Sequence, residues 1–369
     1  MKSEREKQID QAVDSLNGIE MSPNSAQWLR NQARYLKELT NIYADNPDIF
    51  GLHDDLRTKP ELILDTVFRS ADKLLEYQAA YDKALSEIAD ANSISFSSLD
   101  EIPTLLQDLS VAREREQIVG HFKSGGVIAI GLMGTGASGK GTIGKRTGME
   151  RVVNVTTRSR RPSEEHGKDY LYIREMVPEV RDTLDIDTGF NIISMDNGSP
   201  VYELGADGKP INYFDKYGPY LVAVHRPGRA VHGTPISQFK ELYDSGSKAI
   251  FFEHGPVQVQ EAGEKLPTFI KNAKVVPVCI LPPQRGVLPL AFRIAVRTYG
   301  DPDHQDTNVG AGYKISDSYV ESTIGLGQIE ELEMTAKFVK GDKPLGIAFI
   351  VNDDLQEAVD TMKELVSTG

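Results

Sequence analysis

The feature that most constrains this chain is a glycine-rich segment that follows a short apolar run. The run Val127–Ile130 is typical of a buried strand, and it leads into GLMGTGASGKGT, which begins at Gly131. Within this segment the pattern GxxxxGK extends from Gly134 to Lys140. Glycines allow a backbone to curl so that several amide N–H groups point at one anion, and the start of a following helix adds to that attraction. The pattern therefore predicts a phosphate-binding loop between a strand and a helix.

The side chains of this loop have distinct expected roles. Lys140 can neutralise the terminal phosphates of a nucleotide, and Thr142 can approach a phosphate or the coordination shell of Mg²⁺. A glycine-rich turn without a ligand is the alternative, but the strand, the helix and the intact lysine favour ATP with Mg²⁺. The ATP contacts expected from the motif are Gly134, Gly136, Gly139, Lys140, Gly141 and Thr142.

The composition is that of a globular protein, with 40% hydrophobic and 26% charged residues. No apolar run approaches the roughly 20 residues that span a bilayer, and the charged segment from Met1 to Glu20 lacks the apolar centre of a signal peptide. A single cysteine, Cys279, excludes an internal disulfide and is typical of a reducing compartment. We therefore expect a cytoplasmic protein with no membrane partner.

The formal net charge of −13 argues against nucleic acid as a partner, because an acidic surface repels phosphates. Small anionic substrates stay compatible with this charge if basic residues gather in one cleft. Such a concentration of arginines follows the predicted loop, at residues 158–161.

Residues 1–120 are predicted to form an all-helical N-terminal domain. A second amphipathic helix is expected to begin near Ser25, and Asn92–Ser98 to form a loop. No catalytic constellation is visible here, so the expected role is packing, contact with a protein partner, or dimerisation. One apolar face, interrupted at Gln78, recurs at helical spacing through Ile63, Val67, Ala71, Leu74, Tyr81, Leu85 and Ile88.

From about residue 124 onward the pattern is that of an α/β domain. Runs rich in Val and Ile, separated by longer connections, predict buried parallel strands with crossover helices. The polar stretch Glu179–Tyr217 is interpreted as an insertion, with a hairpin expected near Gly205–Gly208. The expected strands are Val127–Ile130, Arg151–Val155, Ala249–Phe252, Val275–Ile280 and Ile347–Val351.

The segment from Thr156 to Tyr170 reads TTRSRRPSEEHGKDY and resembles the guanylate kinase signature TTRxxRxGExxGxDY. Arginine suits phosphate because its planar fork donates paired hydrogen bonds. The resemblance implies that Arg158, Arg161 and Tyr170 clamp the phosphate of the acceptor, and that Glu164 orients the arginines. The alternative, a surface basic run paired with acidic neighbours, does not account for a tyrosine at this spacing.

Further matches on the acceptor side follow in the order of the family. His232 stands in His-Gly-Thr where the family has Tyr-Gly-Thr or Tyr-Gly-Ser, which implies that Thr234 reaches the acceptor base. Asn154 occupies the position where guanylate kinases usually have a serine touching guanine, and Glu253 the position of an acidic residue near Mg²⁺ and substrate. The implied Mg²⁺ contacts are Thr142 and Glu253. The implied acceptor contacts are Arg158, Arg161, Tyr170, His232, Thr234, Asn154 and Glu253.

Matches on the ATP side lie toward the end of the chain. Arg293 and Arg297 resemble the RxxxR of the lid helix that closes over ATP. The sequence VNDDLQEA resembles the family's VNDDLxxA, which implies that Asn352 lies beside the adenine. Asp353 or Asp354 is also the expected N-cap of a last helix. The implied catalytic residues are Lys140, Arg158, Arg293 and Arg297.

The resemblance covers about residues 124–369. It implies a P-loop parallel sheet flanked by helices, a small mixed acceptor-binding subdomain at about 154–247 with the insertion 179–217, and a lid at about 285–328. The implied activity is that of a nucleoside monophosphate kinase, which transfers the terminal phosphoryl group of ATP to a nucleoside monophosphate, with GMP favoured.

The sequence departs from the family pattern where the base is read and in the lid. Ala223 falls near the position of the glutamate that reads guanine, and the second lid motif, which starts at Val320, contains no arginine. A P-loop kinase with another phosphorylated acceptor, or a non-catalytic guanylate-kinase-like interaction module, therefore stays open. Other possible sources of catalytic arginines are Arg160, Arg226 and Arg229.

Overall fold

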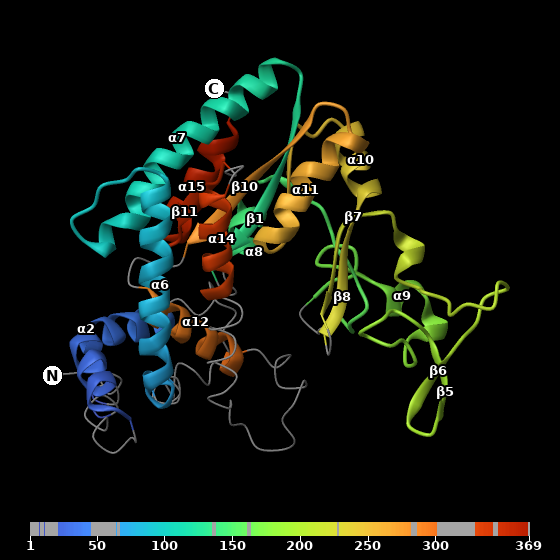
Figure 1. Cartoon of the computed structure of the whole chain (residues 1–369), viewed down its shortest axis with the longest axis horizontal. Helices are drawn as coiled ribbons and strands as arrows, with labels where there is room; N and C mark the ends of the chain where they lie inside the picture. Colours follow the sequence, from blue (N-terminus) through green and yellow to red (C-terminus); the bar gives the residue numbers. More distant parts are fainter. Residues whose placement is uncertain are drawn as a thin grey trace.

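The computed structural model describes residues 7, 11, 21–45, 64, 67–134, 138–160, 164–226, 229–281, 286–300, 329–341 and 346–367. Its centre is a five-stranded parallel sheet in the order β11–β10–β1–β9–β2 (Figure 1). All five carboxyl ends share one edge, the edge at which parallel α/β sheets bind ligands. The strands are β1 (Val127–Gly134), β2 (Glu150–Arg151), β9 (Ala249–Glu253), β10 (Ala273–Leu281) and β11 (Ala348–Val351).

The central strand β1 divides its side chains between the two faces of the sheet, as the two-residue period of a strand requires. Ile128, Ile130 and Leu132 join one buried cluster, whereas Ala129 and Met133 join the other. The first cluster contains residues of α7 (Ile102–Lys123), α8 (Lys140–Arg146) and α15 (Leu355–Val366). The second contains residues of α6 (Ala71–Ala91), α11 (Pro256–Phe269), α12 (Val287–Gly300) and α14 (Glu330–Lys340).

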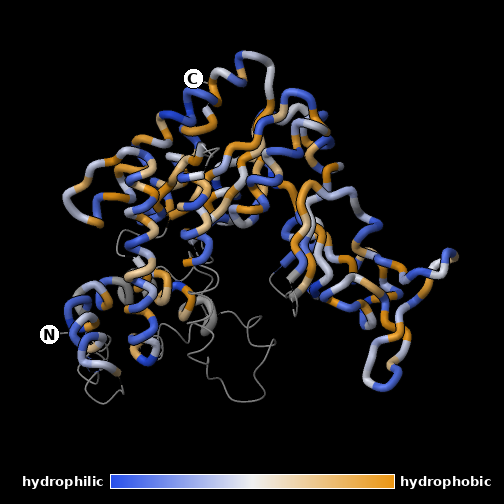
Figure 2. Tube along the Cα trace, in the orientation of Figure 1, coloured by the Kyte–Doolittle hydropathy of each residue, from blue (hydrophilic) through white to orange (hydrophobic). Residues whose placement is uncertain are grey.

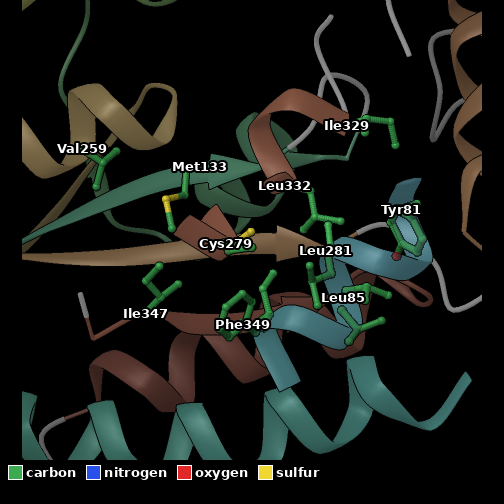
Figure 3. Packing of buried hydrophobic residues seen from close by; sticks show 14 of the residues in the cluster. Tyr81, Leu85, Met133, Val259, Cys279, Leu281, Ile329, Leu332, Ile347 and Phe349 are labelled. Carbon is green, nitrogen blue, oxygen red and sulfur yellow. The ribbon is translucent and has the colours of Figure 1, made fainter. Parts of the chain in front are cut away.

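The N-terminal helices share their core with the sheet. Figure 3 shows Tyr81 and Leu85 of α6 in one cluster with Leu281 of β10 and Leu332 of α14. A further helix, α2 (Pro23–Asp45), packs against α6. The boundary near residue 120 therefore stays a prediction.

Helix α7 protects the edge of the main sheet. Its Ser110 hydroxyl accepts a hydrogen bond from the Phe349 amide at 2.8 Å, and its Gln107 side chain accepts one from the Val351 amide at 2.7 Å. These amides belong to β11, which ends the strand order. Side chains of α7 thus satisfy donors that an open edge would expose to other chains.

A second, mixed sheet lies to one side of the first, on the right in Figure 1. Its order is β4–β3–β8–β7, and a separate two-stranded hairpin, β5–β6, occupies the expected insertion. The strands of this sheet are β3 (Val155–Thr156), β4 (Leu171–Tyr172), β7 (Tyr220–Arg226) and β8 (Arg229–Pro235). The strands of the hairpin are β5 (Ile192–Asp196) and β6 (Ser199–Tyr202). Two helices flank it, α9 (Ile173–Met176) and α10 (Ile236–Asp244), and short 3₁₀ turns cover Leu99–Glu101, Pro178–Val180 and Asp215–Tyr217.

The structure confirms a mixed α/β fold with a parallel sheet flanked by helices, and it corrects one expected strand. The run Arg151–Val155 does not form a single strand, because the chain passes here from one sheet to the other. Arg151 ends β2 in the main sheet, and the Val152 amide makes the last bond to that sheet, to the Phe251 carbonyl at 2.8 Å. Val155 begins β3 in the second sheet.

Two local predictions can be compared with the backbone. The hairpin expected near Gly205–Gly208 is reduced to a turn, which the Gly208 amide closes by donating to the Gly205 carbonyl at 3.0 Å, with one antiparallel bridge between Leu204 and Pro210; the two-stranded hairpin is β5–β6. Asp354 caps α15, since its carboxylate accepts from the Glu357 amide at 2.9 Å. Within the described residues, no helix combines the length and the apolar character needed to cross a bilayer.

If α6 is part of the core of the sheet, removing one of its buried side chains must destabilise the whole protein. Leu85 is 2% exposed, so we expect Leu85→Ala to lower the free energy of unfolding by about 2–5 kcal/mol. Leu109, which is 55% exposed on α7, supplies the control. Leu109→Ala should change the free energy of unfolding by less than about 0.5 kcal/mol. Urea unfolding of both variants tests this, and equal effects would contradict the shared core.

Candidate active site

The loop after β1 has a backbone shape that only glycine allows at two positions. Gly134 has φ +120°, and a Cβ atom there would lie 2.4 Å from the Ile280 carbonyl oxygen. Gly139 has φ +93°, and a Cβ atom there would lie 2.4 Å from Nδ2 of Asn352. Both values of φ belong to a region that L-residues with side chains rarely adopt. The two ends of the segment, Gly134 at the end of the central strand and Gly139 before α8, therefore both depend on glycine.

Three expected ATP-site residues converge on this loop. Asn352 is 5% exposed, and its Nδ2 donates to the Ser138 carbonyl at 2.6 Å. Arg293 of α12 donates from Nη2 to the Asn352 carbonyl at 3.0 Å. Lys140 donates from Nζ to the carbonyl of Gly134, across the loop. The structure thus brings together side chains that lie more than 200 positions apart in the chain.

A carboxylate lies beside the start of α8. A Cβ atom at Gly141 would lie 3.3 Å from both carboxylate oxygens of Glu253, a contact tighter than most, so glycine lets the two groups approach closely. Nη2 of Arg151 forms an ion pair with Oε1 of Glu253 at 3.0 Å. Thr142, on the next position of α8, is exposed. The end of β9 therefore places the Glu253 carboxylate beside Gly141, one position before Thr142 in the first turn of α8.

These groups fit a Mg²⁺ ion that arrives with its nucleotide. Among the described residues, no group of three or more His, Cys, Asp and Glu side chains could hold a metal by itself. Magnesium in nucleotide sites is usually bound by one or two protein oxygens together with phosphates and water. Glu253 and Thr142 supply that kind of donor set.

The expected acceptor clamp is organised around a buried ion pair. Arg158 donates from Nη1 and Nη2 to the two oxygens of Glu164, at 2.7 and 2.5 Å. Tyr172 donates from its hydroxyl to Glu164 at 2.6 Å. The guanidinium carbon of Arg158 lies 4.6 Å from the centre of the Tyr170 ring. Glu164 therefore orients Arg158, as the sequence resemblance implied.

Burial works against the charge of Arg158, but the hydrogen bonds and the negative charge of Glu164 outweigh it and raise the pKa of the guanidinium above its usual value. The bonds to Glu164 occupy one edge of the guanidinium group. Nη1 also donates to the Ser159 carbonyl at 3.0 Å, so Nε and the second hydrogen of Nη2 are the donors that can face an anion.

A chain of buried polar groups lies deeper in the second sheet. Thr234 donates from its hydroxyl to Oδ1 of Asn154 at 2.7 Å, and it lies 2.6 Å from Nε2 of His254. Because the single hydroxyl proton is given to Asn154, His254 must be the donor in the second bond. Burial, followed by the nearby charge of His232, lowers the pKa of His254 to about 3, so its ring is neutral. Thr234 is fully buried, and its hydroxyl is engaged by these two neighbours.

His232 lies beside Tyr170 in the second sheet region. It lies on β8, and its ring centre is 5.6 Å from that of Tyr170. Arg158, Tyr170 and His232 therefore form one group, as expected from the sequence. The structure describes neither Gly136 nor Arg161, nor the side chain of Arg297, so these predictions lie outside the described residues.

Arg151 is the residue that sequence reasoning missed. Besides its ion pair with Glu253, its Nη1 lies 3.8 Å from Asp169, and its guanidinium carbon is 5.9 Å from the centre of the Tyr170 ring. Lys145 of α8 forms a 2.8 Å ion pair with Asp169, so Glu253, Arg151, Asp169 and Lys145 make a row of alternating charges. The available signal was a charged residue at the start of an apolar run, which carries no information about its distant partners.

The strict requirement for glycine at position 139 leads to a prediction. Gly139→Ala would place a methyl group against Asn352 and distort the loop, so we expect the affinity for ATP to fall at least about tenfold. Gly148 is a matched control, because it has a similar φ of +82° but nothing within 4 Å of a Cβ atom. Calorimetric titration with ATP should show a normal affinity for Gly148→Ala. An equal loss in both variants would contradict a role for the contact with Asn352.

Comparison with known proteins adds one structural similarity. No family model matches the chain, and no curated protein matches it. Among solved structures, the chain is similar to the crystal structure of guanylate kinase from Anaplasma phagocytophilum, with 15% sequence identity and a TM-score of 0.32. The match covers 65% of this chain and 84% of that chain. A superposition at this level decides nothing about activity, and the function proposed below rests on the geometry of the site.

Proposed function

We propose that this chain is an ATP-dependent phosphotransferase that phosphorylates a nucleoside monophosphate, with GMP as the favoured acceptor. The observation that carries the proposal is the position of Arg151 between two anion-binding groups. On one side it pairs with Glu253, beside Gly141 of the phosphate-binding loop. On the other it faces Tyr170, which stacks on Arg158 of the acceptor clamp.

The loop would bind the phosphate donor. Gly134 and Gly139, at its two ends, adopt conformations that favour glycine, as a loop whose backbone amides surround a phosphate requires. Lys140 would move from the Gly134 carbonyl to the terminal phosphates, a stronger partner because it is charged. Asn352 and Arg293 would then border the nucleotide from the side of β11 and α12.

The clamp would bind the phosphate of the acceptor. Arg158 is held in place by Glu164, and Tyr170 and His232 supply a hydroxyl and a ring nitrogen next to it. Phosphate oxygens accept hydrogen bonds from all three kinds of group. Since Arg151 links this group to Glu253, the two phosphates would meet near Arg151.

The chemistry requires no covalent intermediate on the protein. A phosphate oxygen of the acceptor would attack the γ-phosphorus of ATP, and the bond from that phosphorus to the bridging oxygen would break, leaving ADP. Catalysis would come from alignment of the two phosphates and from neutralisation of their charge by Lys140, Arg158 and Arg151. Mg²⁺, held by Glu253 and Thr142 when ATP is bound, would supply further neutralisation of the phosphates.

A different phosphorylated acceptor is the second candidate, because the expected base-reading residues are differently engaged. The hydroxyl of Thr234 is occupied by Asn154 and His254, and Ala223 offers no polar group at an exposed position of β7. A base other than guanine, or a phosphorylated sugar, would not require these contacts. A test with several acceptors therefore distinguishes which acceptor is used from whether phosphoryl transfer occurs at all.

The proposal predicts transfer from ATP to a nucleotide that depends on Lys140. With ATP and Mg²⁺ present, GMP, dGMP, AMP and dTMP should be tested in parallel, with product nucleotides separated by chromatography. We expect a diphosphate product, formed fastest with GMP. Lys140→Ala should slow it by about 10²-fold or more, because one preorganised charge is lost at the transition state.

Faster product formation from an acceptor other than GMP would support the second candidate. ATP hydrolysis without any phosphorylated product, or ATP binding without turnover, would contradict the proposed function.

Arg151 provides a separate prediction. Arg151→Met keeps much of the side-chain volume but removes the partner of Glu253, so we expect kcat to fall roughly a hundredfold with a smaller change in the KM for ATP. The matched control is Lys145→Met, at the exposed outer end of the same row of charges. Steady-state kinetics of both variants should show a change of only a few fold in the control. A similar small effect for Arg151→Met would exclude it from the reaction centre.

A further inference from the structure

A polar residue interrupts the buried face of α6, and the structure gives a reason for it. Gln78 lies between Leu74 and Tyr81, which are fully buried in the core. An apolar residue would be expected at this position of the stripe. The side chain of Gln78 is instead directed at the start of another helix.

Gln78 satisfies the first amide of α12. Its Oε1 accepts a hydrogen bond from the Val287 amide at 3.0 Å. The first amides of a helix have no acceptor within the helix, so a side chain from elsewhere can act as a cap. Nε2 of Gln78 donates in turn to Asp82 at 2.8 Å. Gly286, with φ +75°, permits this approach, because a Cβ atom there would lie 2.4 Å from Nε2 of Gln78.

The first half of α12 is enclosed on nearly all sides. Helix α6 packs against both α12 and α14. A helix that is apolar all round is a buried helix, and it cannot swing away without exposing these side chains to water. In this half of α12, the apolar residues that are at most 4% exposed are Val287, Leu288, Leu290, Ala291, Phe292, Ile294 and Ala295.

Arg293 is the charged residue in this enclosed stretch, and it points toward the phosphate-binding loop. It bonds to the Asn352 carbonyl at 3.0 Å, and the Asn352 side chain bonds to the Ser138 carbonyl at 2.6 Å. A continuous path of contacts therefore runs from Gln78, through the start of α12, to the loop.

We propose that Gln78 is a positioning residue for the ATP site: it holds the start of α12, so that Arg293 stays against Asn352 and the phosphate-binding loop. The N-terminal helices thereby serve as the anchor of the lid helix. The effect on ATP binding rests on the proposed function, whereas the effect on the amides of α12 does not.

The test replaces Gln78 by leucine, which restores the apolar stripe and removes the cap. We expect Gln78→Leu to fold with unchanged cooperativity and to exchange the first amides of α12 about tenfold faster, measured by hydrogen exchange of the peptide that begins at Gly286. ATP affinity, measured by calorimetry without an acceptor, should fall about tenfold, the size of effect expected from one lost hydrogen bond. Lys83→Gln, on the exposed face of α6, is the matched control and should change neither quantity.

A rescue variant separates the cap from general packing. Gln78→Glu combined with Asp82→Asn keeps an acceptor for the Val287 amide and reverses donor and acceptor in the second bond. We expect this double variant to recover most of the ATP affinity and the slow exchange. Gln78→Met supplies a second apolar variant if Gln78→Leu does not fold.

Unchanged exchange and unchanged ATP affinity in the apolar variants, or no recovery in the double variant, would overturn the proposal. These readouts are independent of phosphoryl transfer. A wild-type protein that binds ATP but transfers nothing would contradict the proposed function while leaving the role of Gln78 to be decided by the exchange data.

Discussion

The ion pair between Arg151 and Glu253 joins the two halves of the site. Glu253 ends a strand of the main sheet beside the phosphate-binding loop, and Arg151 lies where the chain leaves that sheet for the second one. With its side chain only 16% exposed, Arg151 needs nearby negative charge, and it obtains this from Glu253 and Asp169. The same position brings it to Tyr170 of the acceptor clamp. Among the described residues, Arg151 is thus the side chain that connects Glu253, beside Gly141, with Tyr170.

The donor half depends on a second line of contacts, built on the loop itself. Gly139 allows Asn352 to approach, Asn352 receives Arg293, and α12 is fixed by α6. Figure 2 shows apolar segments in the main sheet and the helices that cover it, and also in the second sheet, which has a smaller core of its own. These contacts join residues far apart in the chain and connect an N-terminal helix with the loop after β1. The fold therefore places α12 within the core.

Sequence patterns predicted local chemistry well and long-range contacts poorly. The GxxxxGK pattern indicated the loop and Lys140, because its glycines act on their own backbone, and Asp354 was identified as a cap by its neighbours alone. Arg158 and Glu164 are six positions apart, so their pairing was within reach of the family resemblance. The contacts of Arg151 with Glu253 and of Gln78 with Val287 were not identified, because each joins residues about 100 or more positions apart that become neighbours only after folding. The split of Arg151–Val155 between two sheets has the same origin: an apolar run does not reveal where the chain changes layer.

The proposed phosphotransferase would bind two phosphate groups end to end, one in the loop and one in the clamp. A dinucleoside pentaphosphate that joins adenosine to guanosine would occupy both positions at once, and linking two ligands raises the effective concentration of the second. Calorimetric titration should show it binding about a hundredfold more tightly than ATP, with the advantage lost in both Lys140→Ala and Arg158→Ala. An affinity no higher than that of ATP, unaffected by Arg158→Ala, would contradict the account.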